Sequence, residues 1–205
     1  MKRQIFFIHG AESFSKYDDF LHYLKTAPLD PFKEPSKRWT HTLREDLGEA
    51  FEVFMPQMPN KQNAKYEEWK LWFERHFSFL HDGVILVGWS QGGYFFVKYL
   101  IENNVPFAIR ALYLIAAPYA NISSDNGEDG GDFQFDTTRV GELAKKVGKI
   151  KLFHSTDDPV VPYRHAEFYK EALSDAELVT FEDRSHFLQE EFLGLLGHLR
   201  SEVGK

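Results

Sequence analysis

The sequence predicts an α/β protein with a doubly wound, mostly parallel six-stranded sheet and helices on both faces. Six short apolar runs alternate along the chain with stretches whose apolar residues recur every three or four positions. This alternation of strands and helices is typical of a parallel sheet. A length of 205 residues suits one such domain, and a hydrophobic content of 43% is sufficient for a packed core. We therefore expect residues 1–205 to form a single domain.

The six runs that we predict to be strands are short, rich in β-branched and aromatic residues, and bounded by turn residues. They cover 4–8, 51–55, 84–87, 111–116, 150–154 and 178–181. Helical spacing of apolar residues predicts seven helices between and after them. These cover 15–25, 39–47, 63–80, 91–103, 140–147, 163–173 and 187–199. In the first helix, one apolar face carries Tyr17, Phe20, Leu21 and Leu24.

Residues 119–138 have no periodicity and place several acidic residues among glycines. We expect an acidic, Gly-rich loop or a minimal cap within the domain, mobile and contributing to selectivity. Calcium binding is the alternative, but the acidic spacing does not match an EF-hand, so a solvated loop is favoured. The sequence predicts no metal site and no cofactor.

The pentapeptide Gly88-Trp89-Ser90-Gln91-Gly92 lies between a predicted buried strand and a predicted helix. A sharp strand-to-helix turn of the pattern G-x-S-x-G lifts a serine hydroxyl above the edge of the sheet. Glycine is needed at the flanking positions because backbone passes close by. The alternative is an ordinary Gly-Ser turn. We interpret Ser90 as a nucleophile.

A serine nucleophile needs a base, and the base needs an orienting acid. In a parallel sheet these groups are expected where strands end. His186 follows the last predicted strand, and Asp157 and Asp158 follow the strand before it. Asp158 is favoured over Asp157 because Pro159 restricts it to extended backbone. The sequence thus predicts a catalytic Ser90, Asp158 and His186.

Backbone N–H groups next to the nucleophile and after the first strand are expected to hold an oxyanion. The sequence puts Gln91 and Ala11 in these two places, although His9-Gly10 could be a simple strand-ending turn. The candidate aromatic walls of the substrate pocket are Trp89, Tyr119, Phe133 and Phe135.

Four stretches, 7–10, 88–93, 157–162 and 185–187, resemble the corresponding motifs of the α/β-hydrolase superfamily. The small size, with Met58-Pro59-Asn60 and the stretch 66–69, is similar to the small serine hydrolases that include the retinoblastoma-binding serine hydrolase. This resemblance implies a compact hydrolase fold with a minimal cap, esterase-like activity and an acid in the Asp-Asp-Pro turn. Trp89 stands where the family more usually has histidine.

We expect a serine hydrolase of carboxylesterase type that cleaves short to medium acyl esters, or thioesters, through an acyl-enzyme on Ser90. Long acyl chains are disfavoured because residues 119–138 offer no amphipathic lid to bury them. The alternatives are a non-catalytic binding protein on the same fold and a peptidase or amidase. A small-molecule ester is the expected partner.

Charge and hydropathy exclude other classes of partner. A net charge of −7 without a basic stripe argues against nucleic acid and mildly disfavours strongly anionic substrates. The absence of cysteine excludes a thiol nucleophile and disulfides. No apolar stretch approaches 18 residues, so no membrane association is expected, and a cytoplasmic location is the default. The oligomeric state cannot be inferred from the sequence.

Overall fold

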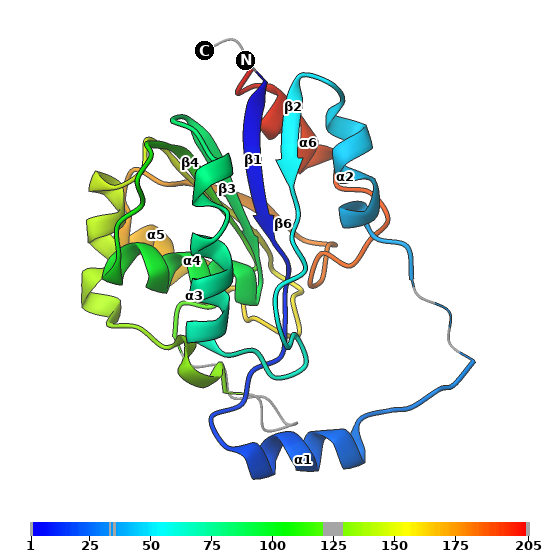
Figure 1. The fold of residues 1–205 in the computed structure, drawn as a ribbon. Helices are drawn as coiled ribbons and strands as arrows, with labels where there is room; N and C mark the ends of the chain where they lie inside the picture. The colour runs from blue at the N-terminus through cyan, green and yellow to red at the C-terminus, as the bar shows by residue number, and fades with distance from the viewer. Residues whose placement is uncertain (1, 33, 35, 121–128, 204–205) are drawn as a thin grey trace.

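The computed structural model describes residues 2–32, 34, 36–120 and 129–203, and its sheet confirms the predicted fold class (Figure 1). Six strands pair in the order β2-β1-β3-β4-β5-β6, and every neighbouring pair is parallel. The strands are β1 (Arg3–Ile8), β2 (Phe51–Phe54), β3 (Val84–Trp89), β4 (Ile109–Ile115), β5 (Ile150–Ser155) and β6 (Glu177–Phe181). All carboxyl ends therefore open on one edge of the sheet.

Helices cover both faces of this sheet (Figure 1). The α-helices are α1 (Tyr17–Thr26), α2 (Trp39–Leu47), α3 (Tyr66–Glu74), α4 (Gln91–Glu102), α5 (Arg164–Ala172) and α6 (Leu193–Arg200). Helices α2 and α6 lie on one face, and α3, α4 and α5 lie on the other. The 3₁₀ segments are η1 (Phe77–Phe79), η2 (Gly131–Phe133) and η3 (Thr137–Lys145), the last replacing the helix predicted over 140–147.

Side-chain alternation along β1 divides the core into two layers. Phe6 and Ile8 are buried with α3 and α4, whereas Ile5 and Phe7 are buried with α2 and α6. Successive side chains of a strand point to opposite faces, so a strand buried on both faces is apolar throughout. The apolar runs of the inner strands reflect this double burial, whereas the edge strands β2 and β6 leave part of their side chains exposed.

Two predicted helices are shorter than their apolar patterns. The helix predicted over 63–80 begins at Tyr66 and ends at Glu74, followed by a 3₁₀ turn. Asn63 does not cap it, because its side-chain oxygen accepts the Phe14 N–H instead. The helix predicted over 187–199 begins only at Leu193. Phe187 has a φ of 56°, which is incompatible with a helix beginning there.

Helix α1 forms as predicted, but none of its side chains is fully buried, and its packing is limited to half-buried residues such as Phe20 and Tyr23, which contact Phe14. Tyr17 and Leu24, on its predicted apolar face, are 66% and 54% exposed. The helix lies apart from the sheet, beyond the carboxyl ends of the strands (Figure 1). The periodicity of apolar residues therefore predicted the helix correctly, but it did not predict how little of its apolar face would be buried.

Part of the predicted loop 119–138 is packed against the body of the protein, and residues 121–128 lie outside the described residues. Asp129 accepts hydrogen bonds from the N–H groups of Ser15 and Gly131. Asp132 accepts one from the N–H of Tyr66 at the start of α3. The described acidic side chains thus act as anchors for neighbouring backbone. None of the helices in the described ranges has the length and hydropathy to cross a bilayer.

Candidate active site

Ser90 occupies the turn between β3 and α4 in a strained conformation. Its φ is 52° and its ψ is −120°, outside the regions that side-chain-bearing residues ordinarily adopt. Its N–H donates to the carbonyl of Ile115 at the end of β4, at 2.8 Å. Its own carbonyl accepts from Gly93 and Tyr94 in the first turn of α4. The bond to β4 and the helix hold Ser90 in this geometry.

The glycines on either side of Ser90 are required by close backbone contacts. A Cβ atom at Gly88 would lie 2.5 Å from the nitrogen of Gly93. One at Gly92 would lie 2.2 Å from the carbonyl oxygen of Ile8, at the end of β1. Both distances are far below van der Waals contact. The pattern G-x-S-x-G therefore follows from packing of the elbow between β1 and α4.

Asp158 and His186 are in contact at the carboxyl ends of β5 and β6. The Nδ1 atom of His186 lies 2.8 Å from Oδ2 and 3.1 Å from Oδ1 of Asp158. Asp158 Oδ1 also accepts the N–H groups of Val160 and Val161, at 2.8 and 2.9 Å. Both side chains are buried, which strengthens the interaction. The backbone of the turn after β5 fixes the carboxylate of Asp158, and this carboxylate orients the imidazole of His186.

Asp157 has a different role from its neighbour. Its Oδ1 accepts the hydroxyl of Ser155 and the N–H of Ser185, and Ser155 Oγ accepts the N–H of Arg184. The hydroxyl of Ser155 is the main cause of the lowered pKa of Asp157, with backbone donors adding to it. Asp157 therefore ties the turn after β5 to the turn that carries His186, and it does not touch the imidazole.

Two tryptophans hold the backbone around His186. Trp89 Nε1 donates to the carbonyl of His186 at 3.1 Å, and Trp39 Nε1 donates to the carbonyl of Phe187 at 2.9 Å. The residues flanking His186 both have positive φ, 47° at Ser185 and 56° at Phe187. The indole donors satisfy carbonyls that this strained turn cannot pair within itself. Sequence reasoning assigned Trp89 to the pocket alone and missed both donors.

The two predicted oxyanion donors have free N–H groups. Within the described ranges, no acceptor pairs with the N–H of Ala11. Gln91 is the first residue of α4, so its N–H precedes the intrahelical ladder. His9 fixes the loop before Ala11, because its Nε2 accepts the Met58 N–H at 2.9 Å while Nδ1 donates to the Gly10 carbonyl at 2.8 Å.

Ser90 and His186 line one cavity of about 380 Å³. The residues around it come from the oxyanion loop, the elbow, the histidine turn and two basic positions: Gly10, Ala11, Glu12, Arg38, Lys61, Trp89, Ser90, Val160, His186 and Leu188. No hydrogen bond joins Ser90 Oγ to His186 among the described residues. In hydrolases this hydrogen bond often forms only when substrate binds.

Of the four predicted aromatic walls, only Trp89 lines this cavity. Phe133 is 0% exposed and packs edge-on against Tyr66 and Trp69, so its assignment to the pocket is wrong. Tyr119 and Phe135 contact each other and do not line the Ser90 cavity. The aromatic residues of 119–138 in the described ranges extend the core and do not shape a substrate site.

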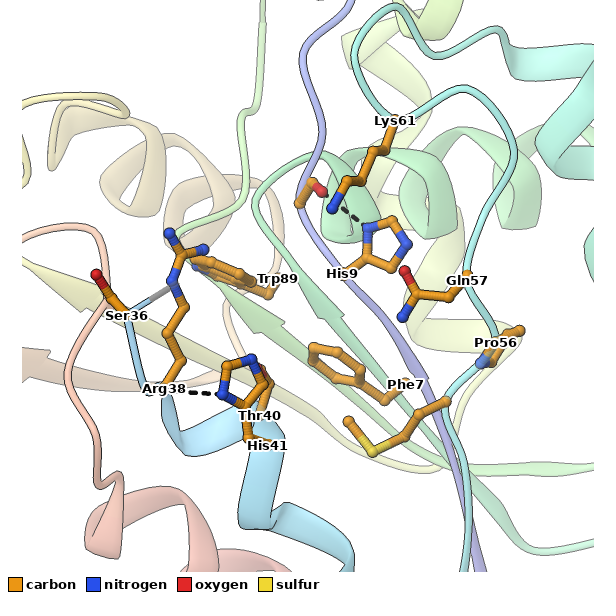
Figure 2. A pocket seen from close by; sticks show the side chains of 12 residues that line it. Phe7, His9, Ser36, Arg38, Thr40, His41, Pro56, Gln57, Lys61 and Trp89 are labelled. Carbon is orange, nitrogen blue, oxygen red and sulfur yellow. Dashed lines mark hydrogen bonds between the residues drawn. The ribbon is translucent and has the colours of Figure 1, made fainter. Parts of the chain in front are cut away.

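A second cavity of about 350 Å³ lies next to the first and shares Gly10, Arg38, Lys61 and Trp89 with it. Figure 2 shows Arg38 beside Trp89 and Lys61 beside His9, on two sides of this cavity. Phe7 contributes an apolar wall. Sequence reasoning identified neither Arg38 nor Lys61, because both lie in loops without a motif.

The other buried histidines near the site are not positioned as bases toward Ser90. His154 Nε2 donates to the Val161 carbonyl at 2.8 Å, and burial lowers the pKa of His154. His165 Nδ1 accepts the Tyr119 N–H at 3.0 Å, and burial lowers the pKa of His165 to about 4. Neither lines the Ser90 cavity. Among the described residues, His186 is the one histidine that does.

Comparisons with known proteins agree with this architecture. Residues 33–200 match the sequence profile of the family described as serine hydrolase. The chain is 27% identical to serine hydrolase RBBP9 of Rattus norvegicus over 167 residues, covering 80% of this chain and 85% of that protein. The structure is similar to the ydeN gene product of B. subtilis, with a TM-score of 0.76, 19% identity and full coverage of both chains.

It also resembles a 2-hydroxy-6-oxo-6-phenylhexa-2,4-dienoate hydrolase of Rhodococcus, with a TM-score of 0.63, 15% identity and coverage of 98% of this chain and 90% of that one. These structural likenesses concern the fold, whereas the family profile spans most of the sequence, including the elbow, the Asp-Asp-Pro turn and the histidine turn. The chain therefore belongs to the serine hydrolase family of the α/β-hydrolase fold.

Proposed function

We propose that this protein is a carboxylesterase-type hydrolase that cleaves esters or thioesters of short to medium acyl length through an acyl-enzyme on Ser90. The observation that carries the proposal is the meeting of Ser90 and His186 in one cavity, with Asp158 bonded to the far side of the imidazole. This is the arrangement in which a histidine can take a proton from serine while an acid holds its tautomer.

The proposed reaction uses the groups in sequence. Ser90 Oγ attacks the carbonyl carbon, and its proton moves to Nε2 of His186. The N–H groups of Ala11 and Gln91 hold the developing oxyanion. His186 then returns the proton to the leaving oxygen or sulfur as its bond to carbon breaks. Water, deprotonated by His186, attacks the acyl-enzyme and releases the acid.

The acyl length follows from the cavity. A volume of about 380 Å³ accommodates a small ester, and the apolar side chains of its lining are those of Ala11, Trp89, Val160 and Leu188. Each methylene left in water forfeits about 0.8 kcal/mol of transfer free energy. We expect acetyl to hexanoyl esters to be cleaved with higher kcat/KM than dodecanoyl esters.

The test is fluorophosphonate labelling combined with hydrolysis of 4-nitrophenyl esters of increasing length. Ser90→Ala is expected to abolish labelling and to lower kcat about 10³-fold or more, because only binding and oxyanion effects remain. Ser78→Ala, at an exposed serine in η1, serves as the matched control and keeps both. Undiminished hydrolysis in Ser90→Ala would remove Ser90 from the mechanism, and a steady rise to sixteen carbons would refute the length preference.

A further inference from the structure

Two cations, Arg38 and Lys61, border both cavities. Within the described ranges, neither Arg38 nor Lys61 forms a salt bridge, whereas Arg110, Lys149 and Lys151 all do. The cavity that contains Ser90 has one carboxylate in its lining, Glu12, and the adjoining cavity has none. Two positive groups against a single carboxylate in the first cavity, and against none in the second, favour an anionic ligand there.

Trp89, the residue that precedes the nucleophile, positions Arg38 to bind an anion. Its guanidinium carbon lies 5.8 Å from the centre of the Trp89 ring, a cation–π distance. A guanidinium against an aromatic face can still present N–H donors to a carboxylate, in the geometry of a bidentate pair. Since Arg38 and Ser90 line the same cavity, an anion bound to Arg38 shares that cavity with the nucleophile.

Lys61 approaches the same space from the loop after β2 (Figure 2). Burial is the main cause that lowers the pKa of His9, and the charge of Lys61 lowers it further, against the hydrogen bond to Gly10. His9 therefore stays neutral and holds the oxyanion loop, while the charge that can meet a ligand is that of Lys61. Phe7, Met55 and Pro56 give the adjoining cavity an apolar wall for a short linker.

We propose that the substrate is an ester carrying a second, free carboxylate, which binds between Arg38 and Lys61 while the ester carbonyl lies at Ser90. This inference rests on the proposed function and narrows its substrate class. The net charge of −7 repels such a substrate at long range. Salt screens this repulsion, so the attraction of the two nearby cations dominates once the carboxylate is at contact distance. The linker is short, because Arg38 and Lys61 line the same cavity as Ser90 and also line the adjoining one.

The first test compares matched esters. Mono-4-nitrophenyl glutarate is compared with 4-nitrophenyl pentanoate, and 4-carboxyphenyl butyrate with 4-carbamoylphenyl butyrate, after subtraction of rates with Ser90→Ala. We expect the anionic member of at least one pair to have the higher kcat/KM, and the pair identifies whether the carboxylate is on the acyl or the alcohol side. Equal or inverted ratios in both pairs would overturn the proposal.

The second test removes the charges. Arg38→Gln and Lys61→Gln are each expected to lower the anionic-to-neutral ratio of kcat/KM about tenfold, the effect of losing one charge-assisted hydrogen bond. Arg38→Lys should restore part of the ratio. Lys37→Gln is the control, because Lys37 is an exposed neighbour that lines neither cavity. A ratio unchanged in the double variant would contradict the assignment.

The third test does not depend on catalysis. Calorimetric titration of Ser90→Ala with glutarate is expected to show binding that Arg38→Gln weakens about tenfold, with inorganic phosphate binding less tightly. If wild-type enzyme hydrolyses no ester but glutarate still binds in this manner, the proposed function fails and the anion site stands. Absence of glutarate binding, or tighter binding of phosphate, would overturn the carboxylate assignment itself.

Discussion

The turns that carry Asp158 and His186 and the helix α1 both lie beyond the strand ends, yet they are held in opposite ways. The turns are bonded to each other through Asp157 and Ser155, and to the core through two tryptophan indoles. Helix α1 has no fully buried side chain. The difference teaches that lying at the same edge of the sheet does not by itself fix a segment: cross-bonds between loops do so here. If His186 is the base that we propose, these bonds hold it to the precision that proton transfer requires.

The largest effect on kcat is expected at the two adjacent aspartates. Replacing each one separately tests whether they have the different roles that their hydrogen bonds indicate. Asp158→Asn is expected to lower kcat about 10³–10⁴-fold, because the imidazole loses its orienting carboxylate and the charge that stabilises its protonated form. Asp157→Asn is expected to cost much less, since an amide oxygen can still accept the bonds from Ser155 and Ser185. The measurement is ester hydrolysis at saturating substrate, and a reversed order would show that the roles are exchanged.

The indole donor of Trp89 is the next target. Trp89→Phe keeps an aromatic ring but leaves the carbonyl of His186 without its donor. An unsatisfied buried acceptor costs about 1–3 kcal/mol, so kcat on a neutral ester should fall roughly tenfold as the histidine turn shifts.

The matched control is Trp72→Phe. Trp72 Nε1 is buried and has no hydrogen-bond partner in the described part of the chain, so its replacement removes no bond. Equal losses in the two variants would mean that the hydrogen bond of Trp89 has no special part in activity.

Acid is expected to lower the stability of the fold through the buried His165 of α5. The folded pKa of about 4 lies below the ordinary value of 6.5, so between these values the unfolded chain binds a proton that the folded chain does not. The free energy of unfolding therefore falls as pH decreases from 6.5 toward 4. His165→Asn keeps an acceptor for Tyr119 and should reduce this slope in urea denaturation measured across that range. Parallel curves for the variant and the wild type would contradict the assignment.

Helix α1 gives the smallest expected effect. Leu24→Gln should change the free energy of unfolding by less than about 0.5 kcal/mol, because the side chain is 54% exposed. Phe192→Ala, which removes a ring buried among Trp39, Phe153 and Phe187, should cost about 3–5 kcal/mol. Denaturant titration of both checks the contrast, and a loss above 2 kcal/mol in Leu24→Gln would show that α1 is packed after all.

The sequence could predict the elements whose pattern is set by local chemistry. The central strand β3 is buried along its whole length and carries no charged residue, and the elbow needs glycines at fixed positions, so both leave a signal in the chain. The order of Ser90, Asp158 and His186 follows from the strands that precede them.

What could not be predicted depends on contacts between distant segments. Phe133 was assigned to a pocket because it lies in an acidic, Gly-rich stretch, yet it fills a gap beside α3. Arg38 and Lys61 converge on the same two cavities from segments with no recognisable pattern. The apolar face of α1 indicated a helix correctly, but periodicity does not tell how much of that face is covered. Phe20 and Tyr23 contact the buried Phe14, whereas Tyr17 and Leu24 are exposed.

The contact between Gly92 and the end of β1 has a consequence for how activity appears during folding. β1 and β3 are paired at Ile8 and Gly88, about eighty positions apart in the chain, and the two N–H groups that we propose for the oxyanion follow these strands. Closing so long a segment is entropically costly and slow compared with helix formation. Helical circular dichroism should therefore return before enzymatic turnover when the unfolded chain is diluted into buffer. Turnover thus reports on the completed pairing of the first and third strands.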